Sequence, residues 1–113
     1  MWPSTDNMLD FEQMQAIQKE LQEKYKNIWK PNTPENATRQ LLWLYGELAE
    51  VGDILKKKGH DAVMNDPEVR RHFVEEMCDV MMYFNDVALC FGITPEEIAQ
   101  VYLEKHERNM KRW

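Results

Sequence analysis

Four acidic residues of this chain form two pairs, and the members of each pair are three positions apart. Glu47 and Glu50 make the first pair, and Glu76 and Asp79 make the second, with 25 residues between the pairs. Residues three apart on an α-helix point in directions that differ by only about 60°. If both segments are helical, each helix presents two carboxylates on one side.

The neighbouring apolar residues place these carboxylates at the predicted core. On a helical wheel Leu44 and Val51 lie within about 60° of Glu47, and Glu76 is flanked by apolar residues such as Phe73. An ionised carboxylate in a core is costly unless it is paired or bound to a metal, and four together repel one another. The inner faces of the two helices carry no Lys or Arg, so we expect a divalent cation. Ligands that are all oxygen favour Mg²⁺, with Mn²⁺ as a substitute, over zinc.

The acidic residues have two other interpretations: a solvated helix face and a di-iron site. A single Glu-x-x-Glu pair most often lies on a solvated helix face, and only the placement beside apolar stripes argues against that. A di-iron bundle would need a His three positions after a Glu. No Glu lies three positions before His60, His72 or His106, which disfavours iron.

Recurring start and stop signals predict the helices that would hold these residues. Three segments combine a capping residue, a proline and a glutamate, as expected at helix N-termini: Thr33-Pro34-Glu35, Asp66-Pro67-Glu68 and Thr94-Pro95-Glu96. Gly59 and Gly92 are placed as helix C-caps. We predict helices at 6–29, 34–58, 67–91 and 95–111, with a loop at 60–66. The fold class is therefore all-α, with four helices in a bundle.

Length and composition limit the classes of protein. The 113 residues fit a single domain, 1–113, and 43% apolar residues are typical of a globular chain. A net charge of −6 argues against binding a nucleic acid polymer. We see no signal peptide at the N-terminus and no window apolar enough to span a membrane, and Cys78 and Cys90 are too far apart on one helix for a disulfide. These features predict a cytoplasmic protein.

The helix at 67–91 is apolar over more than half of its circumference, which four short helices cannot cover. We therefore predict self-association, with helices of two protomers completing one core.

Three blocks of sequence resemble one family. Leu44-Tyr45-Gly46-Glu47-Leu48-Ala49-Glu50 and Glu75-Glu76-Met77-Cys78-Asp79-Val80-Met81-Met82-Tyr83 are similar to the paired acidic motif of the MazG-like all-α nucleotide pyrophosphohydrolases. Lys105, Asn109 and Arg112 follow at a spacing often found near the end of that family, so the resemblance covers about 33–112. Many relatives carry a further acidic residue where this chain has Gly46.

The resemblance implies an enzyme that converts a nucleoside triphosphate or deoxynucleoside triphosphate to the monophosphate and pyrophosphate with Mg²⁺, in house-cleaning of nucleotide pools. It also implies a dimer or tetramer in which a neighbour supplies phosphate contacts. Glu47, Glu50, Glu76 and Asp79 would then be both metal ligands and catalytic residues. Whether a carboxylate or the metal activates the attacking water stays open, as do the number of metal ions, the base and the sugar.

Other residues would contact the substrate. Lys105, Asn109 and Arg112 share one helix face and are expected to hold phosphate, although basic residues also favour a helix C-terminus. Tyr83 is either a core residue or a contact to the nucleotide, as a Tyr near this place is in relatives. Trp29 and Trp43 are packing residues or stack on a base.

Two alternative functions are also consistent with these residues. One is a helical interaction module in which the carboxylates bind a structural cation without catalysis. The other is a phosphoribosyl-ATP pyrophosphohydrolase on the same fold.

Overall fold

The computed structural model describes residues 8–112, and every regular element in that range is helical. The prediction of an all-α chain is confirmed. The elements are α1 (Phe11–Lys24), a 3-10 turn η2 (Pro34–Asn36), α2 (Ala37–Lys58), α3 (His60–Asn65), α4 (Pro67–Cys90) and α5 (Pro95–Arg112). Two predictions fall on residues 1–7, outside the described residues: the start of the first helix at residue 6, and the expectation that the N-terminus carries no signal peptide.

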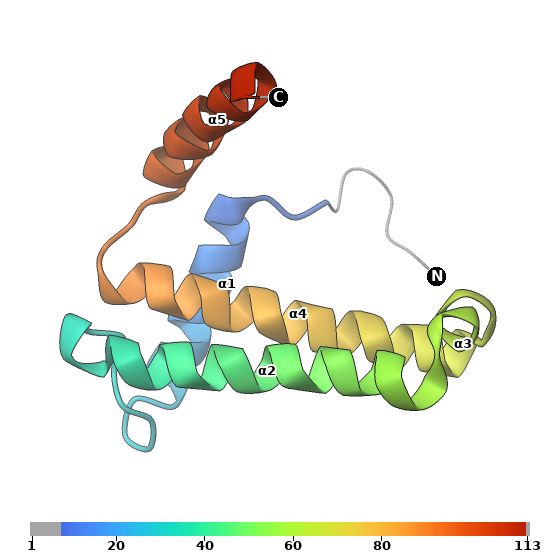
Figure 1. Cartoon of the computed structure of the whole chain (residues 1–113). Helices are drawn as coiled ribbons and strands as arrows, with labels where there is room; N and C mark the ends of the chain where they lie inside the picture. Colours follow the sequence, from blue (N-terminus) through green and yellow to red (C-terminus); the bar gives the residue numbers. More distant parts are fainter. Residues whose placement is uncertain (1–7, 113) are drawn as a thin grey trace.

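The two longest helices, α2 and α4, lie side by side and antiparallel (Figure 1). The short α3 connects them at one end, and α1 crosses α4 on one side of the pair. Helix α5 extends away from the pair and, among the described helices, packs on α1 alone. The helices that carry the four acidic residues are therefore direct neighbours.

The predicted capping residues of α4 and α5 accept the expected hydrogen bonds from the first helical turn. The Asp66 carboxylate accepts hydrogen bonds from the backbone N–H groups of Glu68 and Val69 at the start of α4. The Thr94 hydroxyl accepts one from the N–H of Glu97, at 3.2 Å, in the first turn of α5.

Both predicted glycine stops are confirmed, whereas the predicted cap at Thr33 is wrong. Gly59 and Gly92 have φ values of +85° and +63°, a conformation that residues with a Cβ rarely adopt. The Thr33 side chain makes no capping hydrogen bond. Pro34–Asn36 instead form a 3-10 turn, and α2 begins three residues later than predicted, at Ala37.

Two further boundaries differ from the predictions. The segment 60–66, predicted as a loop, contains α3, which is stabilised by packing against α4 and α2 because six residues are too few to form a helix alone. The first helix spans Phe11–Lys24 instead of 6–29. It begins at a capping box between Asp10 and Gln13, and after it Trp29 folds back to stack on Tyr25, with ring centroids 4.6 Å apart.

The interior combines small apolar residues with polar ones. Its buried apolar side chains are Ala37, Ile54, Ala88 and Cys90, and its buried polar side chains are Gln15, Gln18, Gln40, Asn85 and Asp86. Many large apolar side chains are exposed instead, on α2, α4 and α5.

Within residues 8–112 no single helix is long and apolar enough to cross a membrane. The α4–α5 pair passes that test of length and composition only when taken together, and it is bent by 108°.

Candidate metal centre

Three of the predicted carboxylates converge where α2 and α4 lie side by side. Glu47, Glu50 and Glu76 each offer a carboxylate oxygen, and these three oxygens lie within 4.8 Å of one another. The spacing of three within α2 places Glu47 and Glu50 on one side of that helix, and the antiparallel packing of α4 brings Glu76 to them. The sequence prediction that the two acidic pairs face each other is confirmed for these three residues.

The centre leaves carboxylate oxygens buried without donors. The Oε2 atoms of Glu47 and Glu76 are buried, and neither accepts a hydrogen bond from the residues the structure describes. The other oxygen of Glu76, Oε1, lies 3.3 Å from Nε2 of His72 one turn earlier on α4. Because buried acceptors in proteins are almost always satisfied, the two Oε2 atoms indicate a missing positive or donor group.

Asp79 lies on α4 one turn beyond Glu76, half-buried, and takes part through its charge. Burial and then the charges of Glu76 and Glu75 raise the pKa of Asp79. Its charge in turn helps raise the pKa values of Glu47 and Glu50. Asp79 is therefore part of the same electrostatic group, although its oxygens are outside the 4.8 Å cluster.

The same repulsion affects the two glutamates of α2. Burial is the main cause of the raised pKa of Glu47, followed by the charges of Glu50, Asp79 and Glu76. The pKa of Glu50 is raised first by its approach to Glu76, where a proton held between the two carboxyl groups would form a hydrogen bond, and then by the negative charge of Glu76. All of these groups favour a proton or another cation among them.

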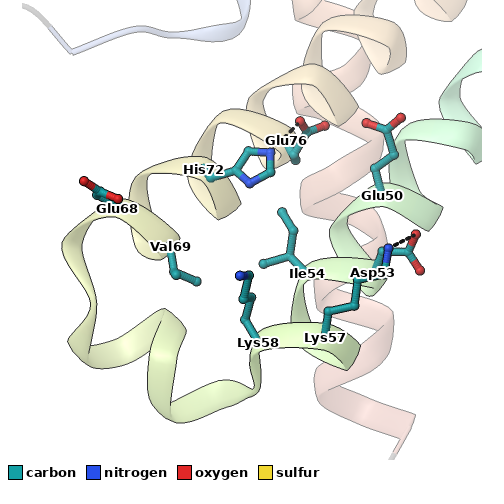
Figure 2. Close-up of a pocket in the computed structure, with 9 residues that line it drawn as sticks. All are labelled: Glu50, Asp53, Ile54, Lys57, Lys58, Glu68, Val69, His72 and Glu76. Carbon is teal, nitrogen blue, oxygen red and sulfur yellow. Dashed lines mark ion pairs between the residues drawn. The ribbon is translucent and has the colours of Figure 1, made fainter.

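A pocket of about 500 Å³ opens beside the carboxylates, between α2 and the first turns of α4 (Figure 2). Glu50 and Glu76 line one side of it, and the lysines Lys57 and Lys58 line another. The Lys58 side chain points into the pocket, whereas Lys57 lies 4.0 Å from Asp53. Sequence reasoning did not include these lysines among the site residues. The spacing of seven between Glu50 and Lys57, which places both on one helix face, was the signal that could have identified Lys57.

A second pocket, of about 510 Å³, lies toward the other end of α4 and includes Asp79. Trp29, Trp43 and Tyr83 contribute aromatic side chains to its lining. Burial, and then the charge of Glu47, raises the pKa of the Tyr83 phenol, so this hydroxyl stays protonated. The three aromatic residues considered from sequence thus lie next to the carboxylate centre.

The predicted phosphate-binding residues of α5 are not brought to this centre within one chain. Lys105 and Asn109 line a separate pocket formed by α5 and the residues just before it. Arg112 is the last residue of the same helix, which packs on α1 and on neither α2 nor α4.

The chain matches no known family model, no curated protein and no solved structure. The donor set of the centre fits a hard divalent cation: three carboxylates with oxygens within 4.8 Å of one another, no thiolate among them, and two buried oxygens to which no residue between 8 and 112 donates. His72 lies 3.3 Å from Glu76, where a side chain can orient a ligand from outside the cluster.

Proposed function

We propose that the protein is a Mg²⁺-dependent nucleotide pyrophosphohydrolase, with Mn²⁺ as a substitute ion, that acts in house-cleaning of nucleotide pools. The proposal is carried by the convergence of Glu47, Glu50 and Glu76 within 4.8 Å, two of them with buried oxygens that lack donors. The choice of reaction is supported by the resemblance of the two acidic motifs to the MazG-like enzymes. The alternative on the same residues is a helical module that binds a structural cation without catalysis.

In this proposal the four carboxylates bind the cation and accept a proton from the attacking water. Glu47, Glu50 and Glu76, with Asp79 beside them, would hold the metal. The bound cation would reverse the local negative charge and polarise the phosphoryl oxygens. Water attacks the α-phosphorus, one of the four carboxylates takes a proton from it, and the α–β bond breaks to release the monophosphate and pyrophosphate.

The lysines of the adjoining pocket support the binding of an anionic substrate in a chain with a net charge of −6. Lys58 points into the space next to Glu76 and is therefore placed to contact phosphate oxygens. This contact would come from the same chain as the carboxylates. It would complement phosphate contacts from Lys105, Asn109 and Arg112 if a partner's α5 reaches the centre.

We also propose that two or more copies associate and that the four-helix bundle is completed between them. On α4, Met77, Met81 and Phe84 form an exposed apolar stripe at spacings of four and three, each more than 40% exposed. On α5, Val101, Tyr102 and Leu103 are exposed by at least 53%. An α5 that leaves its own α2–α4 pair while exposing apolar side chains is suited to packing on a second copy.

One experiment tests the reaction. The full chain is incubated with each common ribonucleoside and deoxynucleoside triphosphate in Mg²⁺ or in chelator, and the products are separated and quantified. Pyrophosphate and monophosphate in equal amounts, only with Mg²⁺, are expected. Orthophosphate in place of pyrophosphate would show that a different bond is cleaved. No product across the panel, despite Mg²⁺ binding, would favour the structural cation site. Phosphoribosyl-ATP is included in the same series, and turnover confined to it would favour a phosphoribosyl-ATP pyrophosphohydrolase.

A further inference from the structure

A chain of buried, hydrogen-bonded side chains forms one wall of the pocket that contains Asp79. Oδ1 of Asp86 accepts hydrogen bonds from Nε2 of Gln18, at 3.1 Å, and from Nδ2 of Asn32, at 2.9 Å. Oδ1 of Asn32 in turn accepts one from Nε2 of Gln40, at 2.9 Å. Asp86, Gln18 and Gln40 are only 4%, 3% and 9% exposed, yet all three line the pocket.

The direction of these bonds determines what the wall offers to a ligand. The amide groups of Gln18, Asn32 and Gln40 each donate within the network. Among residues 8–112, no hydrogen-bond donor is assigned to Oδ2 of Asp86 or to the side-chain oxygens of Gln18 and Gln40. Oδ2 of Asp86 and the oxygens of Gln18 and Gln40 are therefore acceptors on this wall, whereas the second N–H of each glutamine amide, and Lys30 and Arg39 elsewhere in the lining, can donate. A ligand group that meets the Asp86 carboxylate must donate a hydrogen bond to it.

The rest of the pocket suits a flat ring next to a phosphate site. Trp29 comes from the segment after α1, Trp43 from α2 and Tyr83 from α4, so aromatic surface reaches the pocket from three parts of the chain. Asp79 belongs both to this lining and to the electrostatic group of the carboxylate centre. A ring in this pocket would lie on one side of the carboxylates, with Lys57 and Lys58 on the other.

We propose that this pocket binds the nucleobase of the substrate and that Asp86 selects bases carrying an exocyclic amino group over those carrying a carbonyl at the same position. The ligand class rests on the proposed function. An amino group donates to the carboxylate and to a glutamine oxygen, whereas a carbonyl oxygen would face acceptors and a negative charge. Cytosine is thus favoured over uracil, and adenine over hypoxanthine. Asp86 is a specificity-determining residue in this proposal, not a catalytic one.

The test measures binding of matched monophosphates to the full chain by isothermal titration calorimetry in Mg²⁺. CMP is compared with UMP, and AMP with IMP. We expect the amino-bearing member of each pair to bind at least about tenfold more tightly, as for a hydrogen bond to a charged group. Equal affinities within both pairs, or tighter binding of UMP and IMP, would overturn the proposal.

Two variants separate selection from a structural role of the network. Asp86→Asn, whose amide donates to a carbonyl, should reduce or reverse the CMP-to-UMP ratio. Asp61→Asn, at an exposed position on α3, should leave that ratio unchanged. An unchanged ratio in a folded Asp86→Asn protein would remove Asp86 from base selection. If that variant does not fold, Trp43→Leu serves instead: it should weaken CMP and UMP alike, and unaltered affinities would place the base elsewhere.

The outcomes also distinguish this proposal from the proposed reaction. Release of pyrophosphate from all triphosphates at equal rates, with equal binding of CMP and UMP, would support the proposed reaction and contradict the proposed base selection. Tighter binding of CMP without any pyrophosphate release would support the base pocket and reject the reaction.

Discussion

Glu47 on α2 and Glu76 on α4 each bury an Oε2 atom to which no residue between 8 and 112 donates a hydrogen bond. The two residues are 29 positions apart in sequence, and only the antiparallel pairing of α2 and α4 brings them together. Such a pair is unfavourable without a cation, because burial and mutual repulsion both act against the charged forms. The pair therefore supports the proposed cation site.

Replacing Glu76 by Gln should abolish most of the Mg²⁺-dependent turnover. The substitution keeps the size of the side chain but removes a charge from the cluster of three carboxylates. Mutation of a residue that only orients a metal ligand already lowers metal affinity or activity about 10–100-fold. For loss of a ligand itself we therefore expect the rate to fall at least about 100-fold. Initial rates of pyrophosphate release measure it.

The matched control for this substitution is Glu20→Gln, which makes the same chemical change at an exposed position on α1. It should retain the rate of the unmodified protein. Full activity of Glu76→Gln, with Mg²⁺ still required, would remove Glu76 from the centre.

His72→Ala should weaken metal binding less than loss of a ligand does. Nε2 of His72 lies 3.3 Å from Oε1 of Glu76, so it orients that carboxylate from outside the cluster. We expect a loss of about 10-fold in Mg²⁺ affinity, with the maximal rate at saturating Mg²⁺ largely retained. Titrating activity with Mg²⁺ separates the two quantities. His106→Ala, on α5, is the control, and an identical Mg²⁺ dependence in both variants would contradict the role of His72.

The stability of the metal-free protein should depend on pH in a direction set by the carboxylates. The pKa values of Glu47, Glu50 and Asp79 are raised in the folded state, so between the ordinary and the raised values the folded chain binds more protons than the unfolded one. The contribution of these groups to stability therefore falls as pH rises through that window, and their repulsion persists at neutral pH.

Glu47→Gln should accordingly melt a few degrees higher than the unmodified protein at pH 7 in chelator, and the difference should shrink as both are acidified toward pH ~4. Addition of Mg²⁺ at pH 7 should raise the melting temperature of the unmodified protein more than that of the variant. Thermal unfolding followed by circular dichroism gives all of these values. A variant that is less stable than the unmodified protein in chelator at pH 7 would contradict the assigned repulsion.

Local periodicity was sufficient to predict that Glu47, Glu50 and Glu76 converge, but not that Asp79 lies outside their cluster. Glu47 and Glu50 are placed by the phase of one helix and Glu76 by that of another, and the capping signals at Asp66 and Thr94 fixed where the later helices begin. The short α3 was missed because its stability comes from contacts with α2 and α4, which six residues of sequence do not reveal.

Features that depend on contacts between residues far apart in the chain could not be predicted from the sequence. The hydrogen bonds of Asp86 join residues 54 and 68 positions away, so the sequence did not indicate that Asp86 is part of a buried network. The direction of α5 depends on the 108° bend after α4, and for that reason Lys105 lies apart from the carboxylates it was expected to serve. Lys58 was not identified from the sequence because only the packing of α4 creates a pocket beside it.

Lys58→Gln should reduce the apparent affinity for triphosphates more than the maximal rate. Lys58 points into the pocket beside Glu76, where a charged contact with phosphate contributes mainly to binding. We expect KM to rise about 10-fold, as for one hydrogen bond between charged groups that is partly screened by solvent. Initial rates over a range of triphosphate concentrations measure KM and kcat separately.

Lys56→Gln is a closely matched control, because Lys56 is in the same helical turn with the same charge but outside the lining of that pocket. It should leave KM within about twofold. Equal effects of the two substitutions would indicate a general influence of net charge, and the effect of each would then diminish alike as salt is added.

Met81→Glu should dissociate the proposed oligomer. Met81 is 42% exposed in the middle of the apolar stripe of α4, and a charge there would have to be desolvated on association. Light scattering after size-exclusion chromatography at micromolar concentration should show a mass of at least twice 13.6 kDa for the unmodified chain and a shift toward 13.6 kDa for the variant. Met64→Glu makes the same substitution on α3, at a side chain that is 65% exposed and outside the proposed association surfaces, and should leave the mass unchanged. A monomeric unmodified chain would contradict the proposed association directly, and would also mean that Lys105, Asn109 and Arg112 do not reach the carboxylates from a partner.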